Sequence, residues 1–238
     1  MESAHSDLRA NRLLALLDDA TLRPLAAHLE PVPLACRETL YEERKPMTHA
    51  WFPASGVISV LGASTADESP VEVATIGNEG MVGAFSLLEG DRAIGENLVQ
   101  VAGDALRLDI GRFNQHLKES PAFYRLMQRY LYTLICQIVQ AGACNRLHTM
   151  EERCARWLLM MHDRASTDTF HLTQDLLSEM LAVRRATVNL ALGMLKTAGL
   201  IQVLRGQITV LDRPGLEAAA CPCYDIIRRE YAELSKPA

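Results

Sequence analysis

The sequence predicts an α+β protein that begins with a β-roll, continues through one long helix, and ends in a small module of helices and strands. Three observations support this prediction. Short β-type runs separated by glycines fill residues 36–110. A wide apolar stripe at helical spacing follows residue 120, and two short helical patterns with a hairpin pattern occupy residues 171–211. We expect three units, with boundaries at 1–118, 119–145 and 146–238.

The first unit is dominated by strand patterns, apart from two short helical pieces expected within residues 7–30. Leu106 and Leu108 alternate with polar residues, which is the period of a strand. Gly103-Asp104 predicts a two-residue hairpin turn that joins the last two strands. Many short strands with turn residues between them are typical of a sandwich or barrel. The β-type runs lie at 51–52, 57–61, 71–76, 97–102 and 105–110.

The long helix is predicted to begin at Ser120-Pro121, with serine as the N-cap and proline in the first turn, and to end near Cys144. Its apolar stripe is too wide to pack against a single neighbour. One flank can cover the roll, and the other favours a partner helix in a dimer. The alternative is a helix buried entirely within one chain. The residues expected at the dimer interface are Phe123, Met127, Tyr130, Leu134 and Ile138.

The segment from His171 to Leu211 predicts two helices at a sharp angle, followed by a small β-hairpin around Arg205-Gly206. Thr173 suits the N-cap of the first helix, and a tight break precedes the second helix at about 184–197. One face of that second helix is apolar, whereas the opposite face carries an arginine and an asparagine. Arginine can read guanine and asparagine can read adenine in the major groove. The pattern therefore predicts a winged helix-turn-helix that binds double-stranded DNA.

The run TQDLLSEMLAVRRATVNLALGMLKTAGLI, residues 173–201, resembles the winged helix-turn-helix of the Crp/Fnr family of bacterial transcription regulators. The resemblance implies a homodimer on an inverted-repeat operator, with RNA polymerase as a further partner. Arg185 stands where the family has a base-reading arginine, but Ala186 and Leu190 replace a glutamate and an arginine. The operator preference of the best-known members therefore does not carry over. The residues expected to contact DNA are Thr173, Arg184, Arg185, Thr187, Asn189 and Arg205.

Beside that segment, the strand-rich unit resembles the cyclic-nucleotide-binding-like roll (a jelly roll) of the same family. In its ligand-binding members a glycine-glutamate pair precedes a short helix, and an arginine holds the cyclic phosphate. Gly83 matches, but Ala84 replaces the glutamate, and Arg92 lies off register. Burying the ribose hydroxyl and the phosphate without partners is costly. We therefore expect no cyclic-nucleotide cofactor and an unknown effector, with Gly83, Ala84, Phe85 and Arg92 as pocket candidates.

The formal net charge of −5 argues against a protein that is basic over its whole surface and coats nucleic acid. The balance reverses locally at residues 171–214, where five cations face three acids, as suits one DNA-binding module. The N-terminus lacks the features of a signal peptide, and no stretch is long enough for a membrane span, so we expect a cytoplasmic protein with reduced thiols. Cys221-Pro-Cys223 offers half a metal site at best, and no metal is expected.

Two other functions fit the sequence less well. An enzyme on a cupin-like roll would need clustered histidines and a carboxylate, but the roll offers His49 alone, and we expect no catalytic residues. A protein-binding adaptor with a helix-turn-helix that has lost DNA binding would not need its exposed cations. A transcription regulator controlled by a signal at the roll is therefore the function that the sequence favours.

Overall fold

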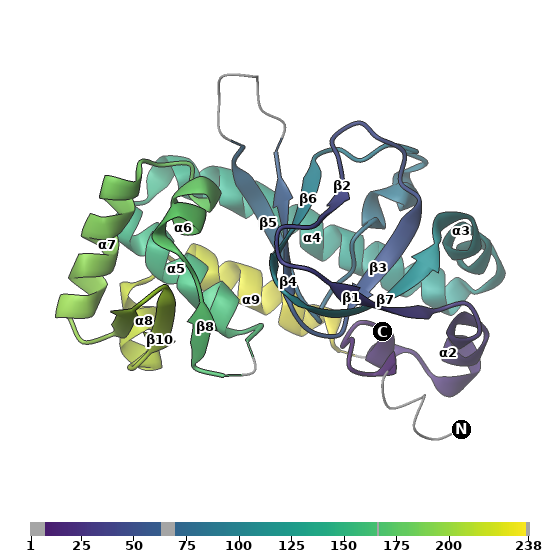
Figure 1. The fold of residues 1–238 in the computed structure, drawn as a ribbon. Helices are drawn as coiled ribbons and strands as arrows, with labels where there is room; N and C mark the ends of the chain where they lie inside the picture. The colour runs from purple at the N-terminus through teal and green to yellow at the C-terminus, as the bar shows by residue number, and fades with distance from the viewer. Residues whose placement is uncertain (1–7, 63–69, 166, 237–238) are drawn as a thin grey trace.

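The computed structural model describes residues 8–62, 70–165 and 167–236. The strand-rich N-terminal part and the C-terminal helical module lie at opposite ends, and α4 (Pro121–Leu147) runs between them (Figure 1). The N-terminal part and the C-terminal module have largely separate apolar cores. None of the helices in the described ranges has the length and apolar character needed to cross a membrane.

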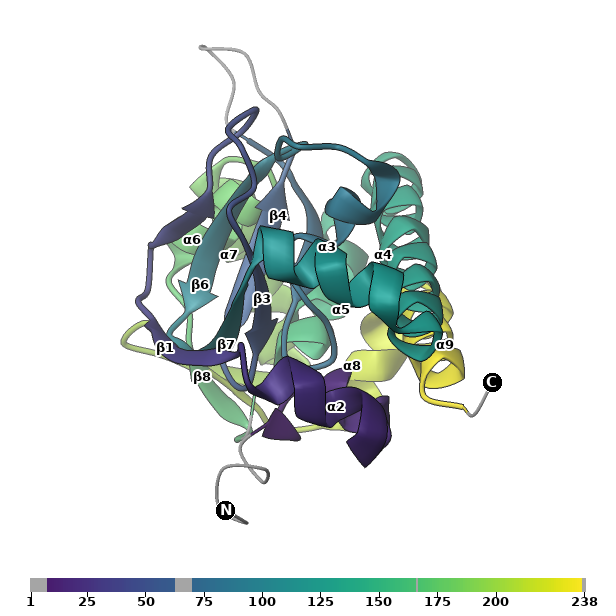
Figure 2. The same ribbon diagram turned by 90° about the vertical axis from the view of Figure 1, so that its right-hand side faces the viewer.

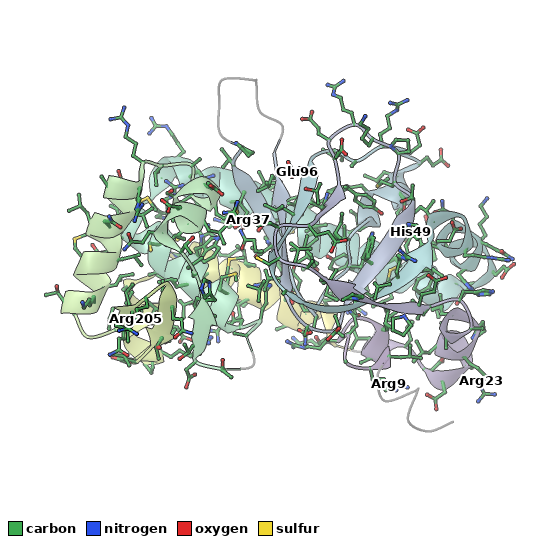
Figure 3. The ribbon with its side chains drawn as sticks, viewed as in Figure 1. Arg9, Arg23, Arg37, His49, Glu96 and Arg205 are labelled. Carbon is green, nitrogen blue, oxygen red and sulfur yellow. The ribbon has the colours of Figure 1, made fainter. Side chains whose placement is uncertain are left out.

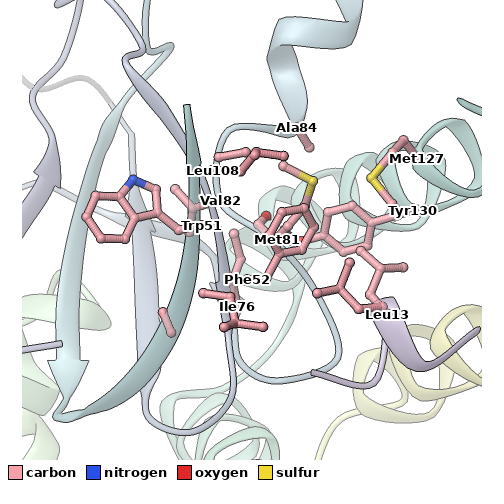
Figure 4. Packing of buried hydrophobic residues seen from close by; sticks show 14 of the residues in the cluster. Leu13, Trp51, Phe52, Ile76, Met81, Val82, Ala84, Leu108, Met127 and Tyr130 are labelled. Atoms are coloured by element: carbon pink, nitrogen blue, oxygen red, sulfur yellow. Dashed lines mark hydrogen bonds between the residues drawn. The ribbon is translucent and has the colours of Figure 1, made fainter. Parts of the chain in front are cut away.

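The roll is built from two antiparallel sheets. One has the strand order β1-β7-β3, and the other has the order β2-β6-β4-β5. Apolar side chains from both sheets fill the space between them, as Phe52, Ile76 and Leu108 show in Figure 4. The strands are β1 (Glu30–Leu34), β2 (Thr39–Tyr41), β3 (His49–Pro53), β4 (Val57–Leu61), β5 (Glu72–Ile76), β6 (Glu96–Val101) and β7 (Gly103–Asp109).

The connection between β6 and β7 corrects the predicted hairpin at Gly103-Asp104. Val101 pairs with Val57 in one sheet, whereas Gly103 pairs with Leu34 in the other, so the chain changes sheets here. A Cβ at Gly103 would lie 2.5 Å from the carbonyl carbon of Ser55. The glycine therefore allows two backbones to approach closely rather than forming a tight turn.

Short helical elements close the ends of the roll. Within residues 7–30, the structure has a 3₁₀ turn, η1 (Leu14–Leu16), and a helix, α2 (Asp19–Ala26), so the first expected piece is only a turn. The carboxylate of Asp18 caps α2 by accepting from the Thr21 amide at 2.8 Å. A second 3₁₀ turn, η2 (Ala84–Leu88), follows Gly83, and α3 (Ile110–Glu119) leads into the long helix.

The long helix α4 begins as the sequence predicted, because the Ser120 hydroxyl accepts from the Phe123 amide. The structure corrects its expected dimer interface. Met127 and Tyr130 point into the core of the roll, toward Met81 (Figure 4), and the Tyr130 hydroxyl donates to the Met81 carbonyl at 2.9 Å. Phe123 and Leu134 are also buried in this core, and Ile138 is half-buried against it. These five residues pack α4 against the roll of the same chain. The wide apolar stripe in the sequence therefore combines two faces of the helix, one that packs on the roll and one that is exposed.

The C-terminal module contains the expected helix-turn-helix and a sheet of order β8-β10-β9. The single expected last helix is in fact two, because Pro222 lies between α8 and α9. Helix α9 returns along α4 beside the roll (Figure 2). The elements are α5 (Met150–His162), β8 (Thr169–His171), α6 (Gln174–Met180), α7 (Arg185–Thr197), β9 (Ile201–Leu204), β10 (Gln207–Val210), α8 (Arg213–Ala219) and α9 (Cys223–Leu234).

Candidate nucleic-acid interface

The turn between α6 and α7 is held by a cap on one side and an apolar core on the other. The Thr173 hydroxyl accepts from the Leu176 amide at 3.2 Å, which fixes the start of α6. Ala182 adopts a left-handed conformation with φ of 50° and so ends the helix sharply. Burial of Leu177 against Val188 and its neighbours then sets the angle between the helices. The predicted inward face of α7 is confirmed, since Val188, Ala191, Leu192 and Leu195 are all buried.

The opposite face of α7 is exposed. Asn189 and Gly193 are exposed there, and Leu190 is 71% exposed. Arg185 forms an ion pair with Asp175 at 3.1 Å, and both side chains are more than half exposed. Such an exposed pair contributes little to stability, so the guanidinium can exchange this carboxylate for a base or a phosphate. The face thus has the polar groups and the open space that a groove-binding helix needs.

The wing is a tight β-hairpin whose tip reaches the start of α6. Arg205 and Gly206 both have positive φ, at 48° and 77°, as in the two-residue turns that suit twisted hairpins. The Gly206 carbonyl accepts from the Leu172 amide at 2.9 Å, which places the tip beside Thr173. Figure 3 shows Arg205 at this tip.

The structure brings the six predicted DNA contacts onto connected surfaces of one module. Arg184 precedes α7 and is exposed, as is Arg185 in its first turn, while Thr187 is half-buried. Thr173 and Arg205 lie on the side of the wing tip. Their actual contacts with DNA remain a prediction.

The roll pocket predicted from the sequence is small and apolar. Gly83, Ala84 and Phe85 line a cavity of about 20 Å³, enough for roughly one water molecule. Arg92 does not line it, because its guanidinium donates to the Arg44 carbonyl at 3.2 Å on the exposed side of the loop. The remaining lining residues are Tyr41, Met47, Val60, Ile76, Met81, Ile94, Gly95, Asn97 and Leu134.

Comparison with known families identifies the C-terminal module. Residues 152–219 match the model of the Crp-like helix-turn-helix domain. The C-terminal module is therefore a Crp-like helix-turn-helix domain. Comparison with curated protein sequences gives no match.

Solved structures of low sequence identity share the overall fold of this chain. FixK2 from Bradyrhizobium japonicum is 17% identical, with a TM-score of 0.70 over 81% of this chain and 98% of that one. A transcriptional regulator of the CRP family from Thermus thermophilus is 18% identical, with a TM-score of 0.65 over 79% and 96%. The c-di-GMP responsive regulator CLP from Xanthomonas campestris is 14% identical, with a TM-score of 0.64 over 81% and 99%.

The roll and the helix-turn-helix module meet through two half-buried acids, Glu72 and Glu79, that sequence reasoning missed. The Glu72 carboxylate on β5 accepts from the Trp157 indole on α5 at 2.7 Å, from the Ser59 hydroxyl at 2.5 Å, and from the Gln100 amide at 3.2 Å. Burial raises the pKa of Glu72 to about 7. Glu79 forms a buried ion pair with Arg164 at 2.6 Å. No local pattern could have revealed these pairs, because 85 residues separate the partners in each.

Proposed function

We propose that this chain is a homodimeric transcription regulator that inserts α7 into the major groove of an inverted-repeat operator, under control of a signal received by the roll. The exposed face of α7 is the observation that supports this proposal most directly. It presents Arg185 and Asn189 beside small or flexible neighbours, while the opposite face is fully used by the core.

The six polar contacts divide by position into two roles. Arg185 and Asn189 project opposite the buried face of α7 and would read base edges. Thr173 and Arg205 lie away from that face and would contact phosphates, together with Thr187 and Arg184. The local excess of cations would then position the module, while α7 specifies the sequence.

The exposed side of α4 supports the homodimer. Apolar or small residues recur there in alternating steps of four and three, the spacing of a two-stranded coiled coil. Tyr132 and Val139 are 63% and 66% exposed, and apart from the backbone of α4 itself no described residue lies within 4 Å of a Cβ built at Gly142. A two-fold pair of such helices would set the recognition helices about 34 Å apart. The stripe consists of Tyr132, Ile135, Val139 and Gly142.

The proposed effector is not a cyclic nucleotide. The cavity beside Gly83 is far smaller than a nucleotide, and Ala84 supplies no acceptor for a ribose hydroxyl. Arg92 faces away from that cavity and is held by backbone at Arg44. The roll would therefore respond to a different ligand or act as a fixed scaffold for α4.

Selection of bound sites from random double-stranded DNA tests the proposal as a whole. The full-length protein should enrich two half-sites in inverted orientation, with centres about one helical turn apart. An Asn189→Ala variant should enrich a motif with one position relaxed in each half-site. An Arg112→Ala variant, altered on the exposed surface of α3, provides the matched control. Failure of the unmodified protein to enrich any motif would contradict the proposed function.

A further inference from the structure

Four side chains with metal-binding atoms converge where the end of α4 meets the start of α9. They are Cys144, His148, Cys221 and Cys223, and their ligand atoms all lie within 4.8 Å of one another. The three cysteines form a small buried cluster of their own, and His148 is half-buried at its edge. Neither the DNA interface nor the roll uses any of these residues.

The local backbone explains why the four residues share one place. Cys144 and His148 are four residues apart at the end of α4, so their side chains project from the same side of the helix. Cys221 and Cys223 flank Pro222, at the break between α8 and α9. The turn at this break, in which the Tyr224 amide donates to the Cys221 carbonyl at 3.1 Å, directs both thiols toward α4.

Two of the separations between these ligand atoms suit a single tetrahedral ion. The Sγ atoms of Cys144 and Cys221 lie 3.5 Å apart, and the Cys223 Sγ lies 3.4 Å from the His148 Nδ1. With Zn–S bonds of about 2.3 Å and Zn–N bonds of about 2.0 Å, tetrahedral geometry requires about 3.8 Å between sulfurs and about 3.5 Å between sulfur and nitrogen. A disulfide would need about 2.05 Å. An iron–sulfur cluster, whose ligands bind different iron atoms, would hold its ligands farther apart.

The surrounding charges also favour an anionic centre at this point. Arg156 of α5 is buried and lies within electrostatic reach of Cys144, Cys221 and the Glu72 carboxylate. It forms no ion pair among the described residues. Its Nε has no hydrogen-bond partner there, and its Nη1 donates only to the Met160 sulfur. Three thiolates around a divalent ion carry a net charge of −1, which would compensate this guanidinium. Gln140 adds an outer hydrogen bond, since its amide donates to the Cys223 Sγ at 3.1 Å.

We propose that Cys144, His148, Cys221 and Cys223 form a structural zinc site that joins α9 to α4. Binding of Zn²⁺ displaces the three thiol protons to solvent, and His148 ligates through Nδ1 in its neutral form. Four protein ligands leave no open position, so the ion is structural rather than catalytic. Because α8 connects the wing to α9, this clamp would fix the DNA-binding module relative to the long helix.

The test uses the full-length protein, reduced, stripped of metal, and then titrated with Co²⁺ and Zn²⁺. We expect one Co²⁺ per chain, with thiolate charge-transfer and tetrahedral ligand-field absorption bands, and displacement of Co²⁺ by Zn²⁺. His148→Ala and Cys223→Ser should each weaken Zn²⁺ binding at least about tenfold. Cys36→Ser, altered at an exposed thiol in the roll, should leave binding unchanged.

A measurement on the unmodified protein keeps the proposal testable even if a variant fails to fold. Addition of one equivalent of Zn²⁺ to the stripped protein should raise its midpoint of thermal unfolding. Absence of stoichiometric binding, or Co²⁺ spectra without thiolate bands, would overturn the zinc site. So would metal binding that Cys36→Ser weakens as much as Cys223→Ser does.

Discussion

The indole N–H of Trp157 on α5 donates to the Glu72 Oε1 on β5 at 2.7 Å, and this hydrogen bond is one of the contacts that join the DNA-binding module to the roll. The Ser59 hydroxyl and the Gln100 amide both donate to the other carboxylate oxygen, Oε2. Any signal that moves β5 therefore acts on an acid that α5 also contacts. This relationship leads to the first prediction.

Glu72→Gln should make the protein more stable than the unmodified chain at pH 8, but not at pH 4. Burial raises the pKa of Glu72 from 4.5 to about 7 in the folded state. The folded state therefore favours the protonated acid, and stability present below pH 4.5 is lost as the pH rises to about 7. The maximum loss is about 3 kcal/mol, since each pKa unit corresponds to about 1.4 kcal/mol. The new amide can keep the bond from Trp157.

Urea unfolding between pH 4 and pH 8 measures this effect as the difference between the variant and the unmodified protein. The Gln100 Oε1 has no hydrogen-bond partner among the described residues, so a flip of that amide would accept from the new side chain. Glu119→Gln, on the exposed surface of α3, should show no such pH-dependent difference. A constant difference across this range would show that the Glu72 carboxyl is not titrating in the folded protein.

Arg185→Ala should weaken binding to the selected operator by about 1–3 kcal/mol and relax the preference at one base pair in each half-site. The reason is that its guanidinium lies on the exposed face of α7, where only an exposed ion pair with Asp175 must be broken. Arg205→Ala should instead weaken binding to all sequences alike and reduce the salt dependence of the affinity. Competition binding against half-site variants distinguishes the two effects, and uniform weakening by Arg185→Ala would refute its assignment to a base.

Val139→Glu should convert a dimer into a monomer at micromolar concentration. Val139 is exposed in the single chain, so the substitution spares the core, but it places two like charges together at a two-fold seam. Sedimentation velocity measures the change. Leu211→Glu, an exposed apolar position after the wing, should leave the dimer intact. If the unmodified protein sediments as a monomer at this concentration, the proposed seam on α4 is wrong.

Cyclic AMP and cyclic GMP should show no binding at micromolar concentrations in calorimetry. The cavity at Gly83 has room for about one water molecule, and none of the described residues that line it is cationic. A phosphate buried there would lack the charge-assisted hydrogen bonds that make such sites favourable. Micromolar binding that Arg92→Ala abolishes would show that the loop rearranges and that Arg92 enters the pocket.

The sequence alone determined the features that depend on neighbours within one or two turns. The caps at Ser120 and Thr173 and the buried face of α7 follow from side-chain chemistry and from the 3.6-residue period. The family resemblance of residues 173–201 rests on this same local pattern, so the order of the residues is enough to recognise it.

Tertiary structure alone decided the features that join distant segments. The apolar stripe on α4 does not by itself indicate which side of the helix packs against the roll. In the structure, Tyr130 is buried in the core of the roll and Val139 is exposed. From the sequence, Gly103 could lie either in a hairpin turn or where the chain passes from one sheet to the other. The structure shows the second, with the backbone of Ser55 close to Gly103. In the sequence, Cys221 and Cys223 provide only two of the four ligands that a metal site needs. The packing of α9 along α4 places them beside Cys144 and His148. The spacing of residues within one element cannot predict such long-range contacts, because they depend on packing between elements that are far apart in the chain.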